Sequence, residues 1–198
     1  MTILQSAIDD NYTKHIKKNG VSTKPIFMEP FEQLLHEELL HYLKSLGIIH
    51  SDIDVCAEMD DLWEKIARPY VPDAIRQWDT HQSPATTMGS MMYIGMAVAK
   101  LWQQGEQERC KMDNLYQSLY NRGGFTEIGR VVSKEVLQLT EEQDQAMAKL
   151  VSDCADRTFA LLKRQDFKPS TRNGFKGYLR CIRQMFIFGA AIEKEKGF

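Results

Sequence analysis

The sequence predicts an all-α fold, a multihelical bundle of about seven or eight helices. Apolar residues recur at helical spacing along most of the chain, and almost no segment shows the alternation of a strand. Each apolar segment also lies between residues that typically begin and end helices. The expected starts are Pro30, Ser51, Ser83–Pro84, Thr140 and Ser170 or Thr171, and the expected stops are Gly47, Gly105 and Gly123–Gly124.

Length and composition indicate one domain. A chain of 198 residues can bury a substantial core, so we expect a single all-helical domain over 1–198, with pseudo-halves near 1–105 and 106–198 as an alternative division. Hydrophobic residues make up 43% and charged residues 26%, as in soluble globular proteins. The net charge of −2 argues against a protein that coats nucleic acid or an anionic membrane.

Charge is divided unevenly along the chain. Residues 1–100 carry 9 Lys/Arg against 14 Asp/Glu, a net charge of −5. Residues 101–198 carry 16 Lys/Arg against 13 Asp/Glu, a net charge of +3. We expect these two halves to attract one another, either within one fold or between two copies in a dimer.

The N-terminus and the cysteines indicate a cytoplasmic protein. The chain does not open with a basic segment and a long apolar run, so no signal peptide is expected. The four cysteines are scattered without a C-x-x-C pair, which argues against a zinc cluster and favours free, mostly buried thiols. They are Cys56, Cys110, Cys154 and Cys181. No cofactor is expected.

Three helices are expected in the first 80 residues, a short one within 1–28 and a second from about Pro30 to Leu46. The apolar residues expected on one face of the second are Phe31, Leu34, Leu35, Leu39, Tyr42, Leu43 and Leu46. A variant capping box at Ser51 predicts a third helix to about Arg68. Pro69 and Pro72 are then expected to break the chain before two further turns over 72–78.

Residues from Pro84 to about Gln104 predict a helix of a different kind. From Met88 to Ala99 every position is apolar or small, as in a helix at the centre of a bundle or in a membrane. This run of about 12 residues is well short of the ~20 that a bilayer requires. We therefore expect a central core helix over 84–104 and no membrane association.

The remaining helices are expected over 106–121, 126–139, 140–164 and 175–194. The third of these opens with the capping box Thr140-Glu-Glu-Gln143, and the fourth is the second central helix. Met91–Lys100 and Met185–Lys194 share Met, Gly, Ala and Lys at matching positions. This echo indicates either a duplicated half with two packed helices or a chance likeness between apolar helices.

Glu38 and His41 are the best candidates for a metal or enzymatic site. Their Glu-x-x-His spacing places a carboxylate and an imidazole one turn apart at the apolar face. Di-iron bundles use two such motifs and this chain has one, so a two-metal site is not expected. A single metal would draw further ligands from His50, Asp52 or Asp54, whereas the alternative is that Glu38 pairs with an arginine of the basic half.

A row of cations is the second candidate, and stacked methionines are the third. Arg172, Lys176, Arg180 and Arg183 are spaced by four, four and three residues, so they line one helix face that could bind phosphate or nucleic acid. The acidic half of the chain is an equal candidate for their partner. Met88, Met92 and Met96 recur every four residues, which suits either the core or an apolar groove for a ligand or partner helix.

The sequence carries no catalytic motif, and it favours a non-enzymatic protein-interaction or regulatory module whose partner is a protein, including a second copy of itself. The first alternative is a metal-binding or enzymatic bundle centred on Glu38 and His41. The second is nucleic-acid or phosphate binding through the cation row, which the overall negative charge makes less favoured.

Overall fold

The fold is all-helical, which confirms the predicted class. The computed structural model describes residues 30–53, 57–79, 84–105, 113–165 and 171–196, and no strand occurs within these ranges. The expected helix within 1–28 lies outside the described residues. The α-helices are α2 (Pro30–Ser45), α3 (Ala57–Asp79), α4 (Pro84–Gln103), α6 (Leu115–Asn121), α7 (Ile128–Val131), α8 (Glu141–Arg164) and α9 (Arg172–Lys196).

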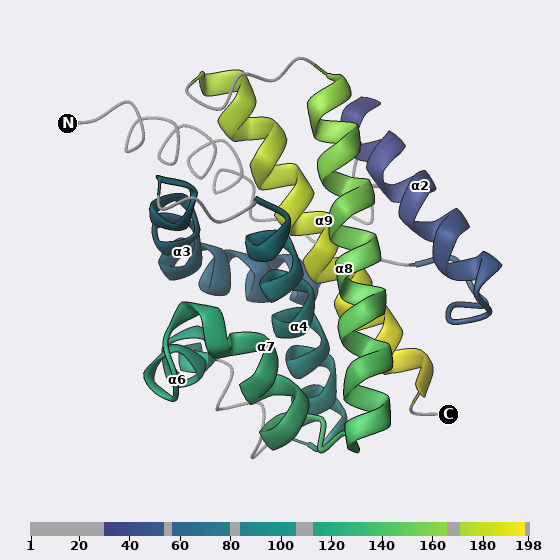
Figure 1. Ribbon diagram of the computed structural model, residues 1–198, viewed down its shortest axis with the longest axis vertical. Coiled ribbons are helices and arrows are strands. Elements are labelled where there is room, and N and C mark those ends of the chain that lie inside the picture. The colour runs from purple at the N-terminus through teal and green to yellow at the C-terminus, as the bar shows by residue number, and fades with distance from the viewer. Residues whose placement is uncertain (1–29, 54–56, 80–83, 106–112, 166–170, 197–198) are drawn as a thin grey trace.

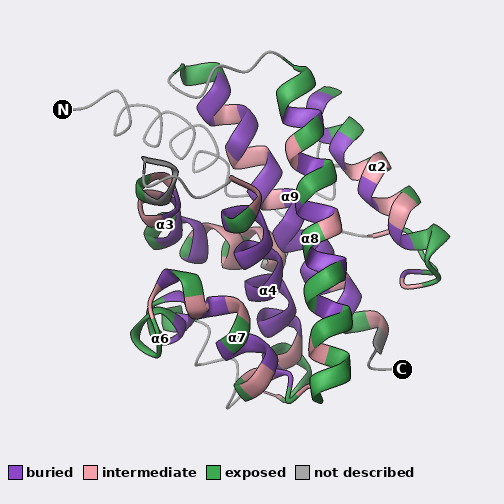
Figure 2. Cartoon of the chain, in the orientation of Figure 1, coloured by how far each residue is buried: buried purple, intermediate pink, exposed green. Residues whose placement is uncertain are grey.

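The two predicted central helices, α4 and α9, form the most extensive contact in the bundle (Figure 1). α8 packs against both of them, α2 packs against α8 and α9, and α3, α6 and α7 cover the opposite side. Every residue of α4 from Thr87 to Ala99 is buried (Figure 2). Its apolar run is therefore the core of the protein. No helix in the described ranges combines the length and apolar character needed to span a membrane.

α4 and α9 touch backbone to backbone because each carries a glycine where they cross. A Cβ atom built on Gly95 would overlap the carbonyl oxygen of Phe186 and lie 2.9 Å from its carbonyl carbon. A Cβ atom on Gly189 would overlap the carbonyl oxygen of Met92 and lie 2.9 Å from its carbonyl carbon. Each glycine thus meets the residue three positions before the other glycine. In the sequence echo Gly95 aligns with Gly189, and Met92 aligns with Phe186. The two glycine contacts are therefore made by equivalent positions of the two segments.

Several predicted helix ends are present as expected. α8 opens with the full capping box: the Thr140 hydroxyl accepts from the Gln143 backbone N–H, and the Gln143 side chain accepts from the Thr140 N–H at 3.0 Å. The expected stops Gly47 (φ 65°), Gly105 (φ 105°) and Gly124 (φ 80°) all adopt positive φ, which glycine reaches without steric cost.

The prediction that Pro69 and Pro72 break the chain is wrong, because both lie inside α3. The missing N–H groups would have bonded the carbonyls of Lys65 and Arg68, and both of these residues lie on the exposed side of α3. Burial holds the segment in place, since Tyr70 is fully buried and its hydroxyl donates to the carbonyl of Thr87 on α4. Packing thus outweighs the local cost of the two prolines.

The segment expected as one helix over 126–139 is instead a 3₁₀ turn (Phe125–Glu127), the short α7 and a π-helical turn (Val132–Val136). The Leu137 N–H bonds the carbonyl of Val132, five residues back, at 2.9 Å. This wider turn brings Leu137, which is 7% exposed, to the buried face next to Val132. Of the helix expected over 106–121, the described part begins at Leu115.

Candidate functional site

The helix α2 lies at the edge of the bundle, and its two long faces differ in kind. Its inner face is a leucine stripe, Leu35, Leu39 and Leu43, with no exposed surface. This spacing of four residues keeps the stripe on one face, which packs against α8 and α9. Burial of three leucines contributes roughly 1.5–3 kcal/mol each, so α2 is firmly attached.

A buried polar network joins the first half of α2 to α9 and α3. The Arg183 guanidinium donates to the Glu32 carboxylate on α2 and to Asp60 Oδ1 on α3 at 2.6 Å. The Gln184 amide donates to Glu32 at 3.2 Å, so its oxygen is free to accept from His36 Nδ1, also at 3.2 Å. Burial alone would lower the pKa of Arg183, but Glu32 and Asp60 outweigh it and the pKa is raised.

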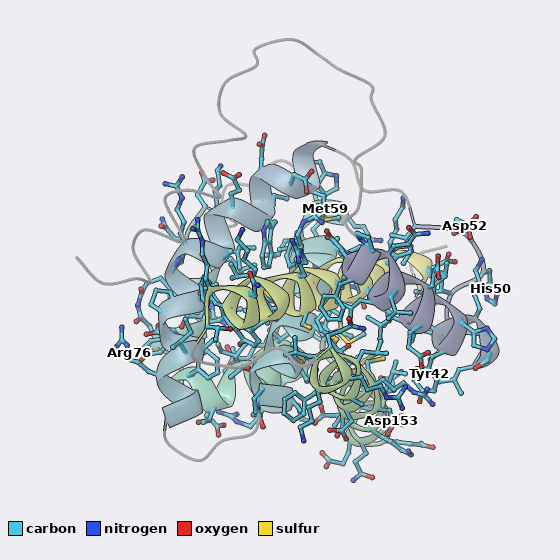
Figure 3. All side chains as sticks on the ribbon, turned by 90° about the horizontal axis from the view of Figure 1, so that it is seen from above. Tyr42, His50, Asp52, Met59, Arg76 and Asp153 are labelled. Carbon is cyan, nitrogen blue, oxygen red and sulfur yellow. The ribbon has the colours of Figure 1, made fainter. Side chains whose placement is uncertain are left out.

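A second set of polar contacts joins the other half of α2 to α8. The Tyr42 hydroxyl donates to Asp153 at 3.0 Å, and the two side chains point toward one another in Figure 3. Burial, followed by the hydrogen bond to the Asp153 carboxylate, raises the pKa of Tyr42. The Arg157 guanidinium lies 4.0 Å from the centre of the Tyr42 ring and also binds Glu38. α2 is therefore fixed along its length by charge as well as by leucines.

The outer face of α2 carries Leu34, Glu37, His41 and Lys44, all of them exposed. Steps of three, four and three residues place these four side chains in one arc of the helix, opposite the leucine stripe. Leu46 follows just after the helix and is also exposed. We call Leu34, Glu37, His41 and Lys44 the outer face of α2.

The prediction that Leu34 shares the buried apolar face of this helix is wrong, and Leu46, which continues the direction of that face past the last turn, is exposed. Leu34 is 39% exposed and Leu46 is 49% exposed, whereas Leu35, Leu39 and Leu43 have no exposed surface. Leu34 precedes Leu35 by one residue and so points about 100° away from it, toward the polar side. The wide stripe of the sequence is in fact a narrow buried stripe with Leu34 on one flank and Leu46 past its C-terminal end. That excess of apolar residues was the available signal for the outer face.

Glu38 and His41, the predicted metal pair, do not converge with further ligands in the described part of the chain, where no group of three or more His, Cys, Asp or Glu side chains could hold a metal ion. Glu38 forms an ion pair with Arg157 at 2.9 Å, the pairing with the basic half that the sequence offered as the alternative. His50 and Asp52 lie beyond the end of α2 (Figure 3), and Asp52 pairs with Lys44 at 2.7 Å. Asp54 lies outside the described residues.

The cation row does not present four equivalent charges to solvent. Arg172 is exposed, Lys176 and Arg180 are half-buried, and Arg183 is turned into the network with Glu32 and Asp60. Met88, Met92 and Met96 have no exposed surface at all and lie in the core between α4 and its neighbours. The structure thus brings Arg183 together with the acidic half of the chain and places the methionines in the interior.

Two thiols in the described ranges are buried and unreactive by environment. Burial raises the pKa of Cys154 to about 12 and raises that of Cys181 as well, so both stay protonated near neutral pH. Buried tyrosines are engaged in hydrogen bonds: the Thr87 hydroxyl donates to the Pro84 carbonyl at 2.8 Å and therefore accepts from Tyr178 at 2.7 Å.

Comparisons with protein-family models, with curated protein sequences and with solved structures find no match.

Proposed function

We propose that this protein is a non-enzymatic helical module that binds a protein partner through the outer face of α2. The observation that carries the proposal is the exposure of Leu34, 39% exposed, on this face, together with that of Leu46, 49% exposed, just past the C-terminal end of the helix. Burying both in a complex would remove apolar surface from water, at roughly 25 cal/mol per Å². Between them, His41 and two charges of opposite sign offer a polar contact region.

The attachment of α2 supports a role in binding. A partner surface is most effective on an element whose geometry is already fixed, because little ordering entropy is then lost on association. α2 is held by its leucine stripe, by Arg183 at one end and by the Tyr42–Asp153–Arg157 contacts toward the other. The outer face is thus displayed by a rigid helix.

The state of the other candidate residues favours this proposal over the two alternatives. Glu38 is already neutralised by Arg157, so a metal would have to displace an ion pair. Arg183 is already neutralised by Glu32 and Asp60, so phosphate would compete with two carboxylates. We also propose a cytoplasmic location, which agrees with the free, buried thiols of Cys154 and Cys181.

Photo-crosslinking in cells of the organism that expresses the protein tests the proposal. The benzophenone amino acid p-benzoylphenylalanine would replace His41 on the outer face, and in a control variant it would replace Asp156, an exposed residue of α8. We expect a discrete protein adduct from position 41 and none of the same mass from position 156. Adding Leu34→Asp should reduce the adduct, because a charge would then enter an apolar contact.

Two results would contradict the proposal. One is the absence of any adduct from position 41 when the variant is folded and present at wild-type level. The other is the same set of adducts from positions 41 and 156, because that would indicate random collisions rather than a defined surface. An adduct that survives Leu34→Asp unchanged would remove Leu34 from the contact.

A further inference from the structure

We propose that the protein has a second contact surface, at the corner where α8 ends and α9 begins, and that this surface binds the phosphate backbone of nucleic acid. It consists of Lys163 and Arg164 in the last turn of α8 and of Arg172 and Lys176 at the start of α9. We call these four residues the basic corner. The corner is separate from the outer face of α2, so the inference goes beyond the proposed function.

Positive charge is concentrated in the segment that contains the basic corner. Residues 157–192 carry eight Lys/Arg against one Asp/Glu, a net charge of +7. The rest of the chain carries 17 Lys/Arg against 26 Asp/Glu, a net charge of −9. The overall net charge of −2 is thus the sum of one strongly basic segment and an acidic remainder. Such a local excess attracts anionic partners even when the whole chain is nearly neutral.

Ion pairing neutralises most cations of the described ranges but not those of the basic corner. Elsewhere, lysines and arginines contact a carboxylate at 4.0 Å or less, among them Lys44, Lys65, Arg122, Lys134 and Lys149. Within the same ranges, Lys163, Arg164 and Lys176 form no ion pair. The Lys163 ammonium lies 4.3 Å from the centre of the Phe159 ring, a contact that leaves its charge uncompensated.

The start of α9 carries charges of the sign that a helix N-terminus disfavours. The helix dipole stabilises negative groups there, yet the first turn of α9 holds Arg172 and no acidic residue, and Lys176 follows one turn later. The preference of the helix end therefore does not account for these charges, whereas an anion bound at the corner would. Arg183 takes no part, because Glu32 and Asp60 already bind it.

The shape of the basic corner favours a chain of phosphates over a membrane or a protein. The two helix ends lie at the same end of the molecule (Figure 1), and Arg172 and Lys176 lie on one face, separated by a rise of about 6 Å. In the described ranges no large apolar side chain of α8 or α9 is exposed. The corner thus lacks both the apolar face that inserts into a membrane and the apolar anchor of a protein hot spot. Point charges alone suffice for phosphate contacts.

Salt-dependent binding to DNA tests the proposal. Fluorescence anisotropy would be measured on the full chain with a short, fluorescently labelled DNA duplex, between about 50 and about 200 mM NaCl. We expect a Kd of about 100 µM near physiological salt, typical of weak binding without sequence preference. Contacts from four cations predict a slope of about −3 to −4 in a plot of log K against log salt concentration, because each contact releases counterions.

Removing one charge from the basic corner should weaken binding and reduce the salt dependence. Arg164→Gln and Lys176→Gln should each raise the Kd about threefold to tenfold and reduce the slope by about one. Lys194→Gln is the matched control, since Lys194 is also exposed and forms no ion pair in the described ranges. It lies about 27 Å along α9 from Lys176, so its loss should change the Kd by less than about twofold.

Circular dichroism would show that the three variants keep the fold. Three results would overturn the inference. One is the absence of binding at low salt with up to about 1 mM protein, and another is an equal loss in all three variants, which would indicate overall charge rather than the corner. The third is tighter binding to phosphatidylserine-containing vesicles or to polyglutamate than to the duplex, which would assign the corner to a membrane or to an acidic protein. The adduct from position 41 is measured separately, so the proposed function can fail or stand independently of these results.

Discussion

Among single residues, Arg183 ties three helices together. Its guanidinium reaches Glu32 on α2 and Asp60 on α3 from its position on α9, and its side chain is 17% exposed. The Glu32 side chain is 12% exposed and also accepts from Gln184. A carboxylate in this environment depends on its cation, because an uncompensated buried charge is costly.

Replacing Arg183 by methionine should therefore destabilise the protein strongly. Arg183→Met keeps much of the side-chain volume but leaves Glu32 without its ion-pair partner, so we expect the free energy of unfolding to fall by about 3 kcal/mol. Arg157→Met is the matched control, since the Arg157–Glu38 pair is 44% and 37% exposed and should cost about 1 kcal/mol. Urea unfolding of both variants measures the difference, and equal losses would contradict a special role for Arg183.

The sequence predicted whether a residue is buried where this depends on the spacing within one helix. It did not predict burial or partners where these depend on contact between two helices. Leu35, Leu39 and Leu43 follow from spacing alone and are buried. Leu34 fits the same apolar pattern yet is exposed, because the width of the buried stripe depends on how closely α8 and α9 approach. The partners of Arg183 lie 151 and 123 residues away in the chain, and no local pattern identifies them.

At the scale of elements, the crossing of α4 and α9 depends on two glycines. Gly95 and Gly189 each face a backbone carbonyl of the other helix, which cannot move aside as a side chain can. This close approach is what lets two helices share the centre of the bundle. It also explains why a helix with glycine in its middle is stable here despite the low helix propensity of that residue.

Adding a methyl group at either glycine should push the two central helices apart. We expect Gly95→Ala and Gly189→Ala each to lower the free energy of unfolding by about 2–3 kcal/mol, the upper part of the range for overpacking. The two changes act at one crossing, so the double variant should cost less than the sum of the single ones.

Gly89→Ala on the same helix is the control for these two variants. A Cβ atom there meets only the end of the Val151 side chain, at 3.1 Å, and the higher helix propensity of alanine works in its favour. Thermal or urea unfolding separates the cases. Losses at Gly95 and Gly189 no greater than at Gly89 would show that the central helices do not depend on close contact.

Elements bounded by strong local signals could be predicted, and those shaped by tertiary contacts could not. The capping box of α8 and the glycine stops depend on a few neighbouring residues, so they are visible in the sequence. α3 continues through Pro69 and Pro72 because Tyr70 is held against α4. The π-helical turn at Val132–Val136 leads into Leu137, which is buried in the core. Both outcomes require knowledge of the neighbouring helix.

For the whole molecule, the opposite charges of the two halves meet inside one chain. Arg183 with Glu32 and Asp60, and Arg157 with Glu38, join the basic half to the acidic half. An intramolecular contact and a dimer were the two explanations of this charge asymmetry that the sequence left open. These ion pairs within one chain favour the intramolecular explanation.

Native mass spectrometry of the full chain, purified without added metal or chelator, tests the central claim most directly, because it reports subunit number and bound metal together. We predict a metal-free protein at every concentration, because Glu38 is already paired with Arg157. A species that carries one metal ion, lost in His41→Ala, would contradict the account and make Glu38 and His41 the centre of the function.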